Sequence, residues 1–261
     1  MRAVRVKDLV LGEGAPAVCV PLMAADEAEL EAALPVLESS PFDLLEWRAD
    51  FWRSGFRMPD GKIDAVLLKR ILERIRAGIG GRPVLFTFRT SREGGNTDLP
   101  YEAWKELLYQ AAVSCADLVD MELRTAGEEA SLLAGLIRSA GAAVVGSAHD
   151  FEKTPSDKEM VSLLMQMQAC GADVSKLAVM PRAEEDVLRV LELGIRMKNG
   201  LADRPYILIS MGQEGMLTRI GCGFTGSALT FASALGASAP GQIPAGLMRQ
   251  ILSCDAPGID T

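Results

Sequence analysis

The sequence contains few of the residues on which many functional sites depend. Only one of its 261 residues is histidine, His149, and five are cysteine. The cysteines are scattered, without Cys-x-x-Cys or paired Cys/His spacing, which argues against a zinc site and a disulfide framework. Lysine and arginine number 27 against 35 acidic residues, and the charge of −8 argues against non-specific nucleic-acid binding. We therefore expect buried, unreactive thiols and no metal.

The chain also lacks an apolar run long enough to cross a membrane. Its first residues, MRAVRVKDLVLGEG, do not build the apolar core of a signal peptide. No serine- or glycine-rich linker and no shift in composition divides it, and 49% apolar residues are enough for a large core. We therefore expect a cytoplasmic protein in which residues 1–261 form one domain.

Eight short apolar runs recur along the chain and alternate with helical patterns, after a short hairpin predicted at Val4–Leu11. The runs cover Ala17–Leu22, Leu44–Trp47, Val84–Phe88, Leu118–Met121, Ala142–Ala148, Val174–Met180, Tyr206–Met211 and Ala228–Ala232. Runs that are apolar along their whole length and joined by helices indicate parallel strands buried on both faces. Eight of them in about 250 residues favour an α/β fold of the (β/α)₈ TIM-barrel type over an open sheet.

Two helix signals are specific enough to test. From Tyr101 to Ala116 the apolar positions follow the i, i+3, i+4, i+7 spacing of one buried stripe, which ends at Cys115. Thr154-Pro155 is typical of an N-cap residue followed by proline at the first helical position. We therefore expect a helix to begin directly after Thr154.

Two residues are improbable in their surroundings. Lys176 interrupts Val174–Met180, a run otherwise without charge, and lysine is rarely buried unless it is paired or neutral. A neutral lysine there would be a nucleophile, whereas a lysine paired with Glu46 or Glu122 would be structural. His149 ends an apolar strand, where a single histidine can be structural or catalytic. The residues alone leave both alternatives open.

Polar residues gather where the predicted strands end, which is where a (β/α)₈ barrel carries its site. They are Glu46, Arg48, Arg89, Glu93, His149, Lys176, Arg219, Ser238 and Gln242. Each arginine taken alone would more often be structural or on the surface. Their joint position at the strand ends is what indicates a pocket.

The segment Gly221–Gly226, GCGFTG, matches the dinucleotide-binding pattern G-x-G-x-x-G. That pattern requires a preceding strand, a following helix and an acidic residue about twenty positions later. Here a helical pattern, Gln213–Ile220, precedes the segment and a strand follows it, and no aspartate or glutamate lies between Gly226 and Arg249. We expect turn glycines rather than a nicotinamide site.

Six segments, in chain order, resemble the signatures of type I 3-dehydroquinate dehydratases. They are Glu46-Trp47-Arg48, Phe88-Arg89-Thr90 with Glu93-Gly94-Gly95, Ser147-Ala148-His149-Asp150-Phe151, Lys176-Leu177-Ala178-Val179-Met180-Pro181, Ser210-Met211-Gly212 and Ser238-Ala239-Pro240-Gly241-Gln242. The resemblance implies a (β/α)₈ barrel, usually a homodimer, that converts 3-dehydroquinate to 3-dehydroshikimate in the shikimate pathway without a cofactor. The chain departs from it at Pro21, where many members carry a serine, so one minor substrate contact is not expected.

The resemblance also implies a role for each site residue. Lys176 would form an imine with the substrate's ketone, and His149, oriented by Glu93, would move protons at the adjacent carbon and the departing hydroxyl. The substrate-binding residues would be Arg219, Gln242 and Ser238 for the carboxylate, Glu46, Arg48 and Arg89 for the ring hydroxyls, and Met211 and Phe231 as apolar walls. Burial and neighbouring arginines are expected to favour the uncharged amine that the attack requires.

Two other functions compete with this interpretation. A Schiff-base aldolase on a similar barrel also needs a strand lysine, but it requires a phosphate-binding or carbon–carbon-cleaving site. A non-catalytic relative would bind a carboxylate tightly without turnover, and would have no need of His149 and Lys176 together.

Overall fold

The computed structural model describes residues 2–236 and 239–254. Its strands are β1 (Val4–Val6), β2 (Leu9–Leu11), β3 (Ala17–Leu22), β4 (Leu44–Arg48), β5 (Val84–Thr87), β6 (Leu118–Glu122), β7 (Ala143–Asp150), β8 (Val174–Val179), β9 (Tyr206–Ser210), β10 (Leu229–Ser233) and β11 (Ile243–Pro244). Its α-helices are α1 (Glu27–Ser39), α2 (Ala65–Gly78), α3 (Tyr101–Val113), α4 (Leu123–Ala126), α5 (Ala130–Ser139), α6 (Asp157–Ala169), α7 (Glu184–Arg196), α8 (Met216–Ile220), α9 (Cys222–Thr225) and α10 (Ala245–Cys254). Short 3₁₀ turns cover Ala49–Phe51, Ser91–Glu93 and Gly127–Glu129, and a π-helical turn covers Met197–Leu201.

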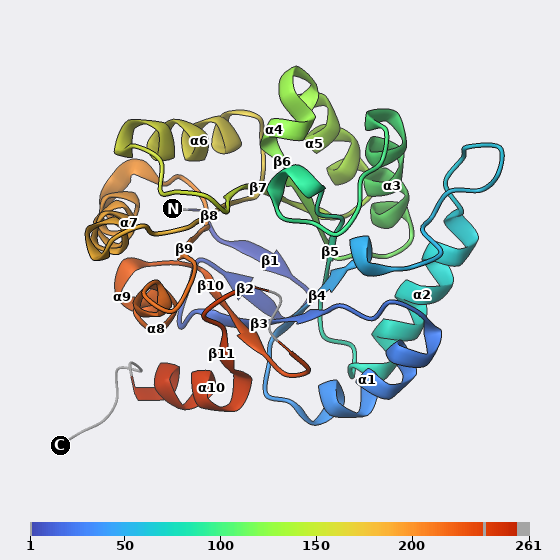
Figure 1. Cartoon of the computed structure of the whole chain (residues 1–261), viewed down its shortest axis with the longest axis horizontal. Coiled ribbons are helices and arrows are strands. Elements are labelled where there is room, and N and C mark those ends of the chain that lie inside the picture. The colour runs from blue at the N-terminus through green and yellow to red at the C-terminus, as the bar shows by residue number, and fades with distance from the viewer. Residues whose placement is uncertain (1, 237–238, 255–261) are drawn as a thin grey trace.

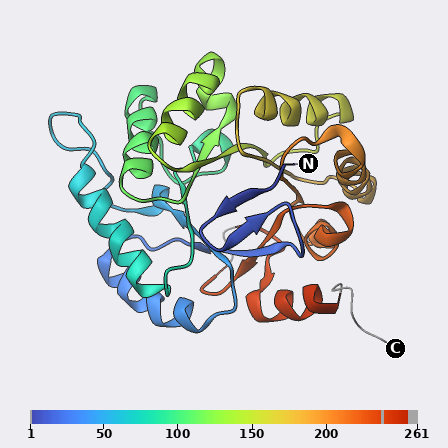
Figure 2. The same cartoon turned by 180° about the vertical axis from the view of Figure 1, so that it is seen from behind.

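Strands β3 to β10 form the wall of a parallel barrel with the helices outside it (Figure 1). Neighbouring strands follow chain order from β3 to β9, and β10 pairs with the other edge of β3. The ring closes between β9 and β10, where the backbone N–H of Ala228 donates to the carbonyl oxygen of Tyr206 at 2.8 Å. The predicted (β/α)₈ fold is confirmed, and so is the hairpin, whose strands β1 and β2 lie across one end of the barrel (Figure 2).

The interior of the barrel changes from apolar to charged along its axis. Alternate residues of a strand point to the same face, so each strand sends every second side chain inward. The first inward layer is apolar and closes against the hairpin; it includes Leu44, Leu85, Leu118, Val145 and Val174. The residues two positions further along the same strands are Glu46, Thr87, Asp120, Ser147 and Lys176. The apolar layer therefore forms the floor beneath a polar layer.

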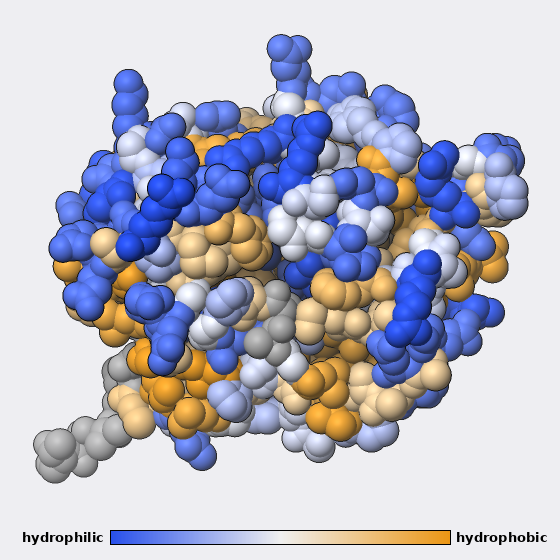
Figure 3. All heavy atoms as spheres, viewed as in Figure 1, coloured by the Kyte–Doolittle hydropathy of each residue, from blue (hydrophilic) through white to orange (hydrophobic). Residues whose placement is uncertain are grey.

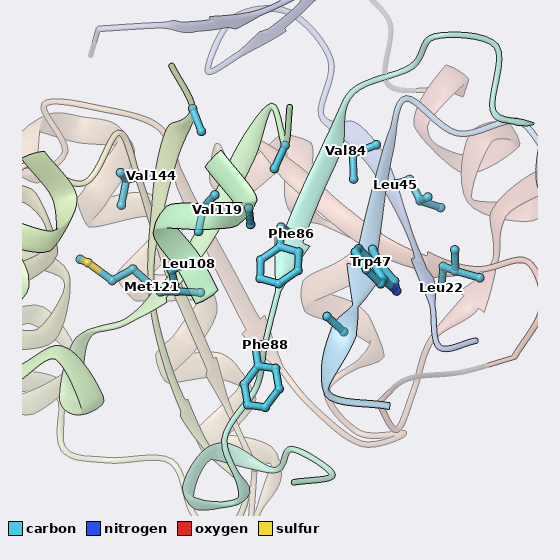
Figure 4. Packing of buried hydrophobic residues seen from close by; sticks show 14 of the residues in the cluster. Leu22, Leu45, Trp47, Val84, Phe86, Phe88, Leu108, Val119, Met121 and Val144 are labelled. Carbon is cyan, nitrogen blue, oxygen red and sulfur yellow. The ribbon is translucent and has the colours of Figure 1, made fainter. Parts of the chain in front are cut away.

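The outward-facing residues of the same strands form a second core against the helices. Figure 4 shows part of it, with Trp47, Phe86 and Phe88 on adjacent strands and Leu108 from α3. The rings of Trp47 and Phe86 meet edge to face, with their centroids 5.5 Å apart. Such aromatic pairs contribute about 0.5–1.5 kcal/mol beyond the area that they bury. This packing fixes the strands from outside, and the inner face is then available for a site.

On the face seen in Figure 3, hydrophilic residues predominate at the top and right, and one of the apolar regions lies at the lower left, over α10 and beside α8. Exposed Leu217 on α8 and Leu247 on α10 belong to these helices. No helix within residues 2–236 and 239–254 has the length and apolar character needed to cross a membrane.

Three local predictions are wrong. The N-cap before α6 is Ser156, whose side chain accepts from the backbone N–H of Glu159 while Glu159 accepts from the N–H of Ser156. Thr154 instead donates its hydroxyl to the carbonyl oxygen of Met180. Ser156 is the better cap because its capping box satisfies two backbone donors at once.

Cys115 does not continue the buried stripe of α3. The helix ends at Val113, and Cys115 is exposed with a left-handed φ of 77°. Cys254 is exposed as well, so the cysteines are not all buried.

Substitution of the true cap tests this assignment. Ser156→Ala should lower the free energy of unfolding by about 0.5–2 kcal/mol, because the backbone N–H of Glu159 loses the hydroxyl that accepts it. The matched control is Ser162→Ala at an exposed position within the same helix, which should leave stability unchanged or raise it slightly, because alanine is the better helix former. Urea unfolding followed by circular dichroism measures both, and equal effects of the two substitutions would contradict the assignment.

Candidate active site

A cavity opens at the carboxyl ends of the barrel strands. It is lined by Glu46, Arg48, Arg89, Glu93, His149, Lys176, Met211, Arg219, Phe231 and Gln242, and also by Gly94, Phe151, Ala178, Ile209 and Ala239. The first ten of these are residues that the sequence predicted for the site. The remaining predicted residue, Ser238, lies outside the described residues.

Lys176 reaches this cavity from the inner face of β8. Its Nζ lies 3.4 Å from Glu46 Oε1, 3.4 Å from Asp120 Oδ2 and 4.5 Å from the centre of the Phe231 ring. The side chain is only 5% exposed. Neighbouring arginines were expected to favour the uncharged amine, but the charged groups in contact with Nζ are two carboxylates. The predicted pair with Glu46 is present, but it leaves Lys176 at the wall of the cavity.

His149 stands on β7, the strand beside Lys176, and lines the same cavity. Its Nδ1 lies 2.9 Å from Glu93 Oε2, which also accepts the backbone N–H of His149 at 3.0 Å. Burial, together with the charges of Arg89 and Lys176, lowers the pKa of His149 well below its usual value. The imidazole is therefore neutral at pH 7, and since Nδ1 faces Glu93, Nε2 is the ring nitrogen left for a ligand.

Glu93 is presented by a tight turn after β5. The turn Ser91–Glu93 is closed by Gly94, which has a left-handed φ of 81°. A side chain at Gly95 would have its Cβ 1.8 Å from the carbonyl oxygen of Arg89, so only glycine allows the chain to pass there. Burial raises the pKa of Glu93 to about 8, with Arg89 opposing this shift. The Glu93-Gly94-Gly95 sequence thus places a carboxyl group of raised pKa against His149.

Arg89 is held by acidic residues inside the barrel. Its guanidinium donates to Asp120 Oδ2 at 2.7 Å, to Glu122 Oε1 at 3.1 Å and to the hydroxyl of Ser147 at 3.0 Å. Burial alone would lower the pKa of Arg89, but Asp120 and Glu122 raise it above its usual value. The sequence prediction missed Asp120, although a charge within the apolar strand Leu118–Met121 is the same signal that identified Lys176.

The two other arginines of the cavity differ in their partners. Arg48 forms a two-point ion pair with Asp50 at 2.8 Å, and Asp50 also accepts the backbone N–H groups of Arg89 and Asn96. Asp50 was not predicted either. Arg219 donates only to the carbonyl oxygens of Phe231 and Pro240, and its Nε has no partner among the described residues. Burial lowers the pKa of Arg219 to about 10, so it remains a charged donor without a carboxylate.

Comparison with known proteins agrees with this geometry. The family model described as type I 3-dehydroquinase matches residues 18–258. This chain belongs to the type I 3-dehydroquinase family. The 3-dehydroquinate dehydratase of Bacillus velezensis is 41% identical over 97% of this chain and 98% of its own, and that of Salmonella agona is 38% identical over the same shares. The predicted enzyme class, a hydro-lyase, is confirmed with the family.

Solved structures of the family superpose closely on this chain. The type I 3-dehydroquinate dehydratase of Clostridium difficile, solved with covalently modified comenic acid, has a TM-score of 0.89, 36% identity and 97% coverage of both chains. The 3-dehydroquinate dehydratase of Geobacillus kaustophilus also has a TM-score of 0.89, at 34% identity, and covers 97% of this chain and 96% of its own. These likenesses extend over the whole barrel rather than over isolated motifs.

The structure also shows where two other sequence features, the GCGFTG segment and Pro21, lie in this type I 3-dehydroquinase. The GCGFTG segment follows α8 and contains α9, so it is not the turn between a strand and a helix that a nicotinamide site requires. Pro21 is not among the residues that line the cavity. Within the described ranges, no group of three or more histidine, cysteine, aspartate or glutamate side chains could hold a metal ion.

The protonation state of His149 can be measured directly. Because it is the only histidine in the chain, a single imidazole signal follows its titration by NMR, and His149→Asn identifies that signal. A lowered pKa means that the neutral ring persists below pH 6.5, so the signal should remain that of neutral imidazole at pH 6. A titration midpoint at or above 6.5 would contradict the effect of burial and of the neighbouring cations.

Proposed function

We propose that this protein eliminates water from 3-dehydroquinate to give 3-dehydroshikimate, a step of the shikimate pathway, through an imine on Lys176. Membership of the type I 3-dehydroquinase family and the names of its relatives support the reaction. The observation that supports the mechanism is the position of Lys176 and His149, which come from adjacent parallel strands and line one buried cavity.

The chemistry assigns each group a separate task. The unprotonated amine of Lys176 adds to the ketone carbon, and the ketone oxygen leaves as water when the protonated imine forms. Nε2 of His149 takes a proton from the adjacent carbon, and the electrons of that bond move to the imine nitrogen. They return when the hydroxyl on the next carbon leaves with the proton from His149. Water then hydrolyses the imine, so one water is lost overall and no cofactor is needed.

Glu93 supports the second task. The proposal requires Nδ1 of His149 to hold its proton so that Nε2 can act as the base. Glu93 Oε2, at 2.9 Å, is the acceptor that holds it. The same pair lets the ring carry the proton briefly between the two steps, because Glu93 in its ionised form favours the charged imidazolium beside it.

The arginines of the cavity are proposed to bind different parts of the substrate, according to whether a carboxylate of the protein already pairs with them. Arg219, together with Gln242 of the cavity lining and with Ser238, is proposed to bind the carboxylate, because Arg219 has no acidic partner in the described part of the chain. Glu46, Arg48 and Arg89 are proposed to bind the ring hydroxyls. The last two arginines are already neutralised by Asp50, Asp120 and Glu122, so they suit neutral hydroxyls better than a second anion. Met211 and Phe231 would be the apolar walls.

Trapping of the imine tests the proposed function. Incubation with 3-dehydroquinate followed by borohydride should attach the reduced ligand to Lys176, as mapped by mass spectrometry. Lys176→Gln should abolish the label and the activity, whereas Lys158→Gln, at an exposed position of α6, should retain both. His149→Asn should still form the adduct but turn over about 10²–10⁴-fold more slowly, because it lacks only the acid–base step.

The outcomes of trapping separate the competing functions. Label on another residue would exclude the proposed mechanism. Tight binding without formation of the conjugated, ultraviolet-absorbing product would indicate the non-catalytic alternative. Carbon–carbon cleavage products would indicate an aldolase.

We further propose that residues 1–261 act as one catalytic domain in the cytoplasm and assemble as a homodimer. The apolar region over α8 and α10 (Figure 3) is the surface that best suits a second copy, because Leu217 and Leu247 are exposed there.

Sedimentation equilibrium tests the dimer. The protein should have twice the 27.9 kDa mass of the chain, because burial of the apolar region would hold two copies together. The double variant Leu217→Asp/Leu247→Asp should have the mass of one chain, whereas the matched control Val66→Asp, on exposed α2, should remain dimeric. A monomeric wild type would contradict the proposal.

A further inference from the structure

Asp120 is a buried carboxylate at the centre of the polar layer that has no role in the mechanism above. It projects inward from β6 and is 2% exposed. Oδ1 accepts the hydroxyl of Ser147 at 2.6 Å and Oδ2 accepts Arg89 Nη2 at 2.7 Å. Burial alone would raise the pKa of Asp120, but Arg89, Lys176 and the Ser147 hydroxyl hold it below its usual value. Asp120 is therefore a negative charge whose position is fixed by two donors.

The amine of Lys176 rests against this fixed charge. Nζ lies 3.4 Å from Asp120 Oδ2 and 3.4 Å from Glu46 Oε1, and the face of Phe231 lies 4.5 Å away. Glu46 differs from Asp120 because, among the described residues, its only other side-chain donor is the hydroxyl of Thr87, and because it lines the cavity, where a ligand can contact it. Asp120 is not among the residues that line the cavity, so a ligand would leave its contact with Nζ intact.

Other titratable groups face this end of the barrel from the surrounding elements. They are Cys19, Arg48, Glu93, Glu122, His149 and Arg219. Among the described residues, none of these six forms a hydrogen bond or ion pair with Lys176 Nζ. Arg89 is also close, but Asp120 and Glu122 neutralise it. The two carboxylates in contact are therefore the groups that act most directly on the charge of Nζ.

We propose that Asp120 is a positioning residue for the Lys176 chemistry: its fixed carboxylate holds Nζ at the cavity wall and offsets the positive charge of the protonated imine formed there. The inference rests on the proposed function. Its physical basis is that condensation turns the nitrogen of Lys176 into a cationic, protonated imine. A nearby anion stabilises this cation, which draws electrons from the adjacent C–H bond.

This role has a signature that a purely structural role lacks. Without the Asp120 charge, the ammonium gives up its proton at lower pH, so the attack begins at lower pH. The protonated imine also loses its proton at lower pH, so the decline of kcat on the alkaline side begins at lower pH. Both limbs of the pH–rate profile should therefore move in the same direction, by about 1–3 pH units for an opposite charge at this distance.

The test compares wild type with Asp120→Asn, which keeps the shape and removes the charge. In the full-length protein, kcat and borohydride trapping with 3-dehydroquinate are followed from about pH 5 to about pH 10, the range in which general acids and bases titrate. In the variant, both limbs should move to lower pH. At the pH optimum of the wild type, kcat should fall at least about tenfold while KM changes less than about threefold, because the lost stabilisation belongs to the intermediate and not to substrate binding.

Glu122→Gln is the matched control. Glu122 lies on the same strand and pairs with the same arginine, at 3.1 Å, but it makes no contact with Lys176 Nζ. Its pH limbs should remain within about half a unit of the wild type, because screening weakens a charge that is not in contact. Unmoved limbs in Asp120→Asn, or an equal shift in Glu122→Gln, would overturn the proposal.

Two further outcomes are informative. If wild type is not trapped at any pH, the proposed function itself is wrong; trapped wild type with unmoved limbs in Asp120→Asn refutes the role of Asp120 alone. If Asp120→Asn does not fold, Ser147→Ala removes one of the two donors that fix Asp120 and keeps the charge. It should lower kcat about threefold or more with KM unchanged, because the hydrogen bond that it removes is charge-assisted and helps to fix the carboxylate. An unchanged kcat in Ser147→Ala would overturn the proposal.

Discussion

The rest of the site depends on the burial of Arg89 inside the barrel. A buried guanidinium is costly unless its charge and its donors are satisfied. Arg89 meets this requirement with Asp120 and Glu122 from the next strand and with Ser147 from the strand after it. Because these partners face the barrel axis, the side chains of Arg89, Asp120, Glu122 and Ser147 form one hydrogen-bonded network above the apolar floor. The polar layer that carries Lys176 is thus a rigid, nearly neutral network.

Within this network the barrel separates fixed charges from available groups. The carboxylates of Asp50, Asp120 and Glu122 are engaged with arginines and backbone or hydroxyl donors. The groups that remain for a ligand are the amine of Lys176, Nε2 of His149 and the guanidinium of Arg219. In the proposed mechanism they would act as the nucleophile, the base and the anion-binding cation of an elimination through an imine.

Burial has opposite consequences for the two members of the His149–Glu93 pair. It lowers the pKa of the imidazole and raises that of the carboxyl to about 8, so both are driven towards their neutral forms. This is how a low-dielectric site acts on a base and an acid. The hydrogen bond between them lies at the wall of the cavity, and the tight Gly94-Gly95 turn keeps Glu93 in place.

The sequence by itself determined the strand order, the period-two alternation of buried side chains and ten cavity residues, because these follow from local pattern and from the rule that barrel sites lie at strand ends. It did not determine which charges pair. Asp120 contacts residues 31 and 56 positions away, and Lys176 meets Glu46 across 130 positions, so no local pattern encodes these contacts. Ser156 displaced Thr154 as the cap for a local reason, because Ser156 and Glu159 form a capping box. Only the closing of the barrel decided that carboxylates, rather than arginines, contact Lys176, because closure alone brings distant strands within the few ångströms at which charges act.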